Sequence, residues 1–115
     1  MADTASSVIS ITIKAAVPVR TFTNMHFEDS AGNTVTEVMS GEDFYVCGKL
    51  VEDTTGVSGA IIYTYVTDSA GSVVGDEKTC ITDTNGNFKC GPYAYSVTED
   101  TVMYFRAFDT KQQTE

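Results

Sequence analysis

The sequence predicts an all-β domain built as an antiparallel sandwich of about seven to eight strands. Short runs of β-branched and aromatic residues alternate with clusters of Gly, Asp, Asn and Ser, a pattern typical of strands joined by turns. The runs recur roughly every eight to twelve residues, the spacing expected of a sandwich or barrel. No sustained helical period is present. At 115 residues the chain is long enough for one modest core.

The first two predicted strands cover residues 8–14 and 19–28. Residues 8–14 alternate between apolar and polar side chains, which predicts a half-buried strand; the apolar face is formed by Ile9, Ile11 and Ile13. In residues 19–28, the alternation places Val19 and Phe27 on one face together with the odd-numbered residues between them. We therefore expect both segments to contribute to the core.

The remaining strands are predicted from similar runs. In residues 44–51, we expect Phe44, Val46 and Leu50 to point inward and Gly48 to allow a close approach of another strand. Five other runs are predicted to be strands: 34–39, 60–67, 73–82, 87–95 and 101–108. Together they predict a single domain, residues 1–115, with short arms at 1–7 and 111–115.

Three predicted turns share a D-x-x-G core, at residues 29–32, 68–71 and 83–86. An Asp at the first position accepts hydrogen bonds from backbone N–H groups ahead of it, and a Gly at the fourth adopts the left-handed conformation. The sequence therefore predicts strand hairpins at these three places.

The third turn places Cys80 opposite Cys90, at a Cβ separation of about 4.5–5.5 Å that strand twist can adjust to a disulfide. Such a bridge would form in an oxidising compartment. Alternatively, all three cysteines, including Cys47, are small buried hydrophobic residues or one forms an intermolecular bond. A structural zinc site is not expected, because the chain has no C-x-x-C motif and a single histidine.

The charge excludes two classes of partner. Seven basic residues against sixteen acidic ones give a net charge of −9, which repels nucleic acid and anionic membranes. No apolar stretch approaches the length of a membrane span, so no membrane insertion is expected. The acidic residues include five Asp/Glu doublets near predicted turns, which we interpret as loop-solubilising and anti-aggregation charge.

The alternative for the acidic loops is Ca²⁺ binding, and no other cofactor is expected. Asp83, Asn85 and Asn87 offer oxygen ligands at alternate positions, as at the start of a calcium loop. The twelfth position of that loop, where a bidentate Glu belongs, is Ala94. The turn interpretation is therefore favoured.

The sequence contains no recognisable catalytic motif. His26 is the only histidine and lies on a predicted strand without an evident orienting partner. The two acids of each doublet would point to opposite faces of a strand, so they cannot act together as a glycosidase pair. We therefore expect the protein not to be an enzyme.

Residues 44–108 resemble the prokaryotic immunoglobulin-like or transthyretin-like domains, including the carboxypeptidase-regulatory-like group. Such domains pair a G-x-L strand, a tight turn into a G-A-x-V strand and a T-D-x-x-G-x-F hairpin; the matching segments here are Cys47–Asp53, Thr55–Ile62, Thr82–Phe88 and Tyr104–Phe108. The resemblance implies an immunoglobulin-like sandwich that serves as a surface, adhesive or assembly module. These motifs specify a fold and carry no active site.

Together these observations predict a non-enzymatic structural module of a larger extracellular or virion assembly: a decoration, fibre or surface-filament subunit that binds another protein or itself. The alternative is an adhesion module that binds carbohydrate or a receptor. Exposed coplanar aromatics are typical of glycan sites, and the candidates are Tyr63, Tyr65, Tyr93 and Tyr95. Packing in the core is the other interpretation of these tyrosines.

Overall fold

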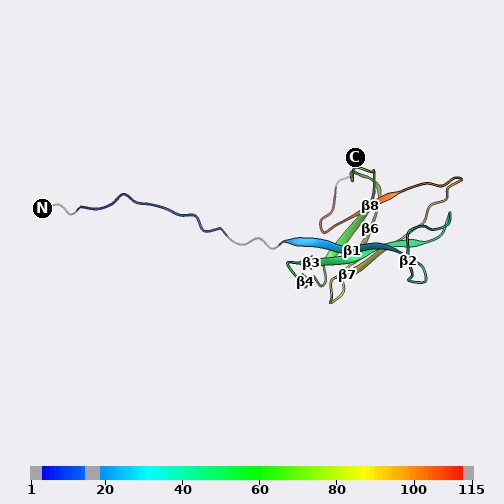
Figure 1. Ribbon diagram of the computed structural model, residues 1–115, viewed down its shortest axis with the longest axis horizontal. Coiled ribbons are helices and arrows are strands. Elements are labelled where there is room, and N and C mark those ends of the chain that lie inside the picture. Colours follow the sequence, from blue (N-terminus) through cyan, green and yellow to red (C-terminus); the bar gives the residue numbers. More distant parts are fainter. Residues whose placement is uncertain (1–3, 15–18, 113–115) are drawn as a thin grey trace.

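The computed structural model describes residues 4–14 and 19–112 and confirms the all-β prediction. These residues form eight strands and no helix, arranged as two antiparallel sheets (Figure 1). The strands are β1 (Arg20–Asp29), β2 (Thr34–Val35), β3 (Phe44–Glu52), β4 (Thr55–Gly56), β5 (Ile61–Thr67), β6 (Val73–Ile81), β7 (Asn87–Tyr93) and β8 (Tyr104–Phe108). β2 is shorter than predicted, and the two-residue β4 was not predicted.

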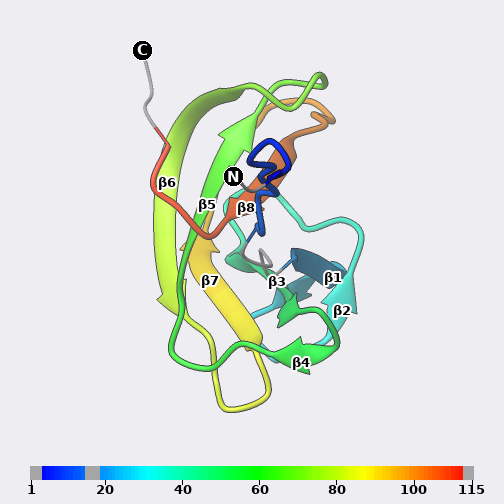
Figure 2. The ribbon, with the colours of Figure 1, turned by 90° about the vertical axis from the view of Figure 1, so that its left-hand side faces the viewer.

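The two sheets differ in size and connectivity. In the first sheet, β3 is central: β1 pairs with one of its edges and carries β2, while β7 and the short β4 pair with the other edge. The second sheet has the order β6-β5-β8. Figure 2 shows this three-stranded layer lying over the larger sheet. The outer strands of the second sheet are therefore β6 and β8.

The core lies between the two sheets and is densest under their central strands. Phe44, Val46 and Leu50 of β3 point inward and are buried, as their alternation predicts. The other buried apolar members of the core come from β5 and β7: Ile62, Phe88, Cys90 and Tyr93. β3, β5 and β7 thus supply the part of the core that water does not reach.

The predicted facing of β1 is wrong in its first half, because the strand contains a bulge. Its register against β3 shifts between Thr23 and His26, and Asn24 adopts a left-handed conformation with φ of 55°. A bulge inserts an extra residue and reverses the alternation beyond it. As a result Phe22 and Phe27, which differ by an odd number of positions, both pack against the core.

The three D-x-x-G turns form with the predicted chemistry. In each turn, one carboxylate oxygen of the Asp accepts two backbone N–H groups at 2.8–3.0 Å. The glycines at the fourth position have φ of 87°, 89° and 87°. After the third turn, however, the flanking strands separate: β6 pairs with β5, and β7 pairs with β3. The predicted hairpin pairing of residues 73–82 with 87–95 is therefore wrong beyond the turn itself.

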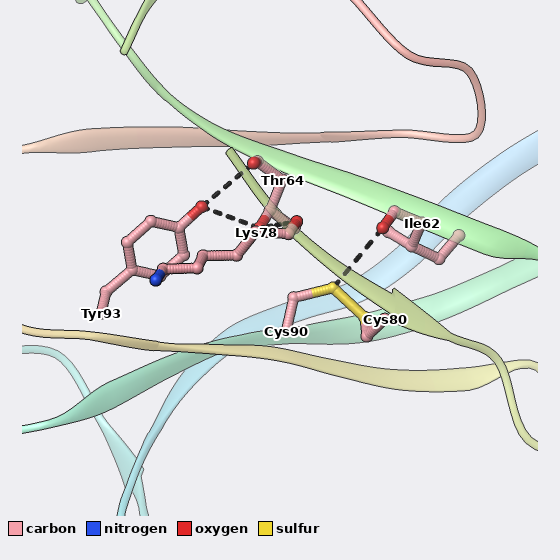
Figure 3. The surroundings of a disulfide bond; sticks show 6 residues. All are labelled: Ile62, Thr64, Lys78, Cys80, Cys90 and Tyr93. Atoms are coloured by element: carbon pink, nitrogen blue, oxygen red, sulfur yellow. Dashed lines mark hydrogen bonds between the residues drawn. A yellow bond between two sulfur atoms is a disulfide. The ribbon is translucent and has the colours of Figure 1, made fainter. Parts of the chain in front are cut away.

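The side of the sandwich formed by β6 and β7, here called the closed side, is cross-linked between the sheets. A disulfide joins Cys80 of β6 to Cys90 of β7, with Cα atoms 5.1 Å apart (Figure 3). Nearby, the Tyr93 hydroxyl donates to the carbonyl oxygen of Thr64 on β5 at 3.0 Å. The two sheets are therefore joined on this side by a covalent bond and a buried hydrogen bond.

The chain termini differ from the predicted arms. Residues 8–14 are not a half-buried strand: the structure shows residues 4–14 as an exposed segment without strand pairing, running away from the sandwich (Figure 1). At the other end, the backbone N–H of Gln112 donates to the Tyr65 hydroxyl at 2.9 Å, so this part of the predicted arm 111–115 packs on the second sheet. Residues 1–3 and 113–115 of the predicted arms lie outside the described residues.

The disulfide predicts a measurable loss of stability on its removal. Cys80 and Cys90 are 10 residues apart, and closing a loop of that size contributes about 2.5 kcal/mol by restricting the unfolded chain. We expect Cys80→Ala/Cys90→Ala to lower the free energy of unfolding by roughly that amount in urea titrations. A reductant should destabilise the wild type similarly and leave the double variant unchanged. Equal stability of the two proteins would contradict the prediction.

Two glycines with the same backbone conformation provide a matched test of the packing around the third turn. Gly32 and Gly86 both have φ of +87°, but a Cβ at Gly32 meets nothing within 4 Å, whereas one at Gly86 would clash with the Leu50 carbonyl oxygen. We expect Gly32→Ala to cost about 1–2 kcal/mol of backbone strain. Gly86→Ala should cost clearly more in the same urea titration, because the β3 backbone must also move. A similar loss for both variants would contradict this account.

Candidate assembly site

The most unusual feature of the molecule is its exposed N-terminal arm, residues 4–14. The side chains of Ile9, Ile11 and Ile13 are 91%, 86% and 89% exposed, and Val8 is 97% exposed. None of the arm residues pairs with a described strand. The arm therefore presents an alternating row of large apolar side chains to water.

This exposure leaves a large gain in free energy unrealised. Full burial of an Ile side chain contributes about 1.5–3 kcal/mol, and three such side chains lie on one face of the arm. The arm also differs from the rest of the chain in charge: residues 4–14 contain Lys14 and no acidic residue, while the whole chain carries −9. It is thus an apolar, weakly basic segment attached to a strongly acidic domain.

A second feature is the side of the sandwich opposite the disulfide, where the core is only partly buried. This open side is bounded by β1 and β8, which face each other through Phe27 and Phe105 at a ring-centroid distance of 5.5 Å. The inward side chains of these two strands are only partly buried; they are Phe22, Phe27, Phe105 and Ala107. The core is therefore buried under β3, β5 and β7 but only partly buried along this open side.

The open side also contains an unpaired strand edge. β8 pairs with β5 along its whole length, from Tyr104 to Phe108, and in the described part of the chain no strand pairs with its other edge. The free edge of β1 is different, because β2 covers Phe27 and Glu28 and the bulge at Asn24 interrupts it. Such devices discourage further strand pairing, and β8 has neither.

The four candidate tyrosines do not form an exposed aromatic platform. Tyr65 and Tyr93 are buried, with 0% and 2% of their surface exposed. Tyr63 lies with Tyr65 in the second sheet, whereas Tyr95 follows β7 and stacks against Tyr93. The Tyr95 hydroxyl donates to Asp76 at 2.6 Å, and burial together with that carboxylate raises the pKa of Tyr95. The core interpretation therefore applies to Tyr65 and Tyr93.

The candidate calcium ligands Asp83, Asn85 and Asn87 are used to build a turn. One carboxylate oxygen of Asp83 accepts the backbone N–H groups of Asn85 and Asn87 at 2.8 and 3.0 Å. The turns at Asp29 and Asp68 have the same arrangement although their other residues differ. The geometry of this loop is thus explained by turn formation alone.

A cluster that the sequence did not reveal lies on the outer face of the first sheet. Cross-strand pairing sets His26, Cys47 and Lys89 side by side on β1, β3 and β7. His26 Nε2 lies 2.7 Å from Glu28, and the Lys89 ammonium lies 3.3 Å from the same carboxylate. The sequence spacing of His26 and Glu28 indicates that both lie on one face of β1. Their neighbours Cys47 and Lys89, on β3 and β7, cannot be identified from the sequence, because they depend on the register of the sheet.

The titration properties of this cluster follow from its contacts. The Asn24 carbonyl and Glu28 raise the pKa of His26, and His26 followed by Lys89 lowers the pKa of Glu28. Burial, with a contribution from Glu28, raises the pKa of the Cys47 thiol to about 12. Although His26, Glu28 and Cys47 offer ligand atoms within 4.8 Å of one another, a metal would have to break the contact between His26 and Glu28 and deprotonate this thiol. The arrangement is best described as an ion-pair network.

Comparison with known proteins adds no further identification: the chain matches no family model, no curated protein and no solved structure. The resemblance of residues 44–108 to immunoglobulin-like and transthyretin-like domains therefore remains a prediction. Within residues 4–14 and 19–112 there is also no helix that could cross a membrane.

The ion-pair network predicts a pH dependence of stability that a single residue controls. Because the pKa of His26 is raised above its ordinary value of 6.5, the folded state binds this proton more tightly, and the stabilisation is lost as the pH rises through the folded pKa. Because the pKa of Glu28 is lowered from 4.5, its contribution is lost in acid. We expect the free energy of unfolding to fall between pH 6 and pH 8, roughly around the His range.

The matched variant for this prediction is His26→Gln. It should flatten the decrease between about pH 6 and 8, where no other side chain of ordinary pKa titrates. NMR titration of the single imidazole gives the folded pKa directly. An imidazole pKa at or below the ordinary value would contradict the assignment.

Proposed function

We propose that this protein is a non-enzymatic structural subunit that assembles with copies of itself through its N-terminal arm, as part of an extracellular or virion fibre, coat or surface filament. The observation that carries the proposal is the exposed row of Ile9, Ile11 and Ile13. A monomer gains nothing from displaying these side chains in water. Burying them against a neighbour would recover that free energy, offset by the cost of association.

Two further features support an assembly role. The disulfide suits a protein that works in an oxidising environment such as the outside of a cell or particle. The incomplete open side of the sandwich offers half-buried apolar surface of the kind that the arm would cover. The same chain thus contains both an apolar segment without a strand partner and a core that is only partly buried on one side.

The proposal is tested by the mass of the full chain in solution, measured by light scattering over a range of concentrations. We expect the wild type to form species larger than one chain as concentration rises. The variant Ile9→Ser/Ile11→Ser/Ile13→Ser should keep the mass of a single chain, because its arm has lost its apolar face. Since the arm makes no strand pairing with the sandwich of its own chain, the thermal unfolding of the variant should match that of the wild type at concentrations where the wild type is a single chain.

The matched control removes exposed apolar side chains elsewhere. Val74 and Ile81 of β6 are 62% and 65% exposed, and Val74→Ser/Ile81→Ser should assemble like the wild type. Assembly of the triple arm variant to the same extent as wild type, or a wild type that stays a single chain at every concentration, would overturn the proposal.

The charge of the subunit predicts a salt dependence opposite to that of an electrostatic complex. Two copies that each carry −9 repel each other, and added salt screens this repulsion. We expect the mean mass to increase between roughly 0.01 M and 0.5 M NaCl, over which the Debye length falls from about 30 Å to less than 10 Å. Dissociation by salt would indicate that ion pairs, and not apolar burial, hold the copies together.

The alternative, a module that binds carbohydrate or a receptor, receives less support from the geometry. Its aromatic candidates are divided between buried positions and separate surfaces. A shallow hollow of about 610 Å³ at one end of the sandwich is lined in part by Arg20, Asp109 and Lys111. These side chains already pair with each other or with neighbouring acids. A glycan screen with the wild type tests this alternative directly.

A further inference from the structure

We propose that the arm of one copy adds to the free edge of β8 in a second copy, as an antiparallel strand that fills the open side of the sandwich. This inference rests on the proposed function and names the surface that receives the arm. Strand addition supplies affinity through backbone hydrogen bonds and specificity through alternate side chains. The proposal therefore requires a strand edge that is free to pair and an arm whose inward and outward side chains alternate in step with those of that strand. It also requires a reason why the arm binds a second copy and not its own domain.

The alternation of the arm matches that of β8. In a sheet, directly paired residues point to the same side. Phe105 and Ala107 of β8 pack against the core clusters, while Tyr104 and Arg106 are exposed. An arm can pair with β8 so that its odd-numbered residues point inward beside Phe105 and Ala107. In that arrangement Ile9, Ile11 and Ile13 enter the open side. The even-numbered residues Ser10, Thr12 and Lys14 then remain on the outer face. With Lys14 opposite Tyr104, residues 10–14 pair with the whole of β8, Tyr104–Phe108, so that Ile13 lies beside Phe105, Ile11 beside Ala107 and Ile9 just beyond the strand.

The edge of β1 is the competing acceptor on the same side, and its geometry is less suitable. Its ladder is interrupted between Thr23 and His26, and β2 occupies its far end. Continuous pairing along it would be limited to the few residues before the bulge. β8 provides an uninterrupted edge in the sheet that has only three strands.

The position of the arm within the chain favours a second copy over folding back. Arg20, at the start of β1, lies 3.4 Å from Asp109, just after the end of β8. An arm that turned back onto β8 of its own chain would place Lys14 near this end and Val8 near Tyr104, so it would run parallel to β8. The arm of another copy is free to approach antiparallel, the slightly more stable arrangement in which paired residues lie directly opposite each other.

The order of the strands is consistent with a strand position beside β8. Immunoglobulin-like sandwiches pair strands A, B and E in one sheet and strands C′, C, F and G in the other. The orders β1-β3-β7 and β6-β5-β8 correspond to A-B-E and C′-C-F. The next strand in that series, G, would lie against the free edge of β8. The arm would take this position from outside the chain.

The test is cross-linking between two separately prepared full-length variants, each with one added cysteine. Arg106→Cys provides the acceptor, and Ser10→Cys or Thr12→Cys provides the donor, because all three side chains are expected on the outer face. After mixing and mild oxidation, we expect a disulfide-linked pair with twice the mass of the chain. Cys47 is buried and remains in both proteins.

Three controls define the geometry. Ile11→Cys, which should point into the sandwich, is expected to cross-link poorly to Arg106→Cys. Thr23→Cys on β1 should cross-link poorly to the arm variants. With Tyr104→Cys as acceptor, Lys14→Cys should react in preference to Val8→Cys if the strands are antiparallel, and the reverse preference would indicate a parallel arrangement.

The outcomes separate this inference from the proposed function, because light scattering on the same mixtures before oxidation reports assembly independently. Assembly with cross-links to Thr23→Cys in place of Arg106→Cys, or with none to either, would overturn the β8 site and leave arm-mediated assembly standing. An intrachain bond in dilute Thr12→Cys/Arg106→Cys, detected as a mobility change at constant mass, would show that the arm fills its own domain. Absence of assembly in every mixture would overturn both.

Discussion

The structure depends on the way the two sheets are cross-linked: in the described part of the chain, the covalent bond and the buried hydrogen bond between them lie on one side. At β6 and β7, the Cys80–Cys90 disulfide ties the sheets together, and the Tyr93 hydroxyl bonds across to Thr64. These links hold the sheets together where the inward apolar side chains of β3, β5 and β7 are buried. On the other side, β1 and β8 are connected among the described residues by side-chain packing and by an ion pair at one end, and the core there is only partly buried.

The treatment of the strand edges follows the same asymmetry. An unpaired edge is a general liability, because it can pair with any other extended chain. The edge of β7 lies beside the cross-linked β6, and that of β1 is interrupted by a bulge and covered in part by β2. The edge of β8 has no comparable protection among the described residues, although its inward side chains belong to the core. A net charge of −9 limits indiscriminate association between such molecules.

Local signals in the sequence predicted most of the sandwich. The alternation of Phe44, Val46 and Leu50 gave the correct facing of β3, and the D-x-x-G turns formed as expected, because both depend on residues close in sequence. The bulge at Asn24 was not predicted, since its register is set by pairing with β3. The separation of β6 from β7 was missed for a similar reason: a turn reverses the chain but does not decide which strand pairs with which. The His26–Glu28–Lys89 network depends on the same long-range register.

The most informative error concerns residues 8–14. Their alternation encodes a half-buried strand, but a sequence does not specify whether the surface that buries it belongs to the same chain. The open side next to β8 gave no sequence signal of its own, because an unpaired edge is defined by the position of all the other strands. The sequence therefore predicted one half of the candidate site, the apolar segment 8–14, but placed it in the core of its own domain. It did not predict the other half, the free edge of β8.

An arm and an accepting edge at different places on one chain form a heterologous contact. If the arm adds to β8 of a neighbour as proposed, each subunit would give its arm to one neighbour and receive the arm of another, so a row of subunits would have a direction and two chemically distinct ends. One terminal subunit would display an unsatisfied arm and the other an unfilled edge. Different partners would then act at the two ends of the row. A partner with a free strand edge would bind the exposed arm at one end, and a partner with an apolar extended segment would bind the unfilled edge at the other. Either partner could stop growth at its end or attach the row to a cell or particle.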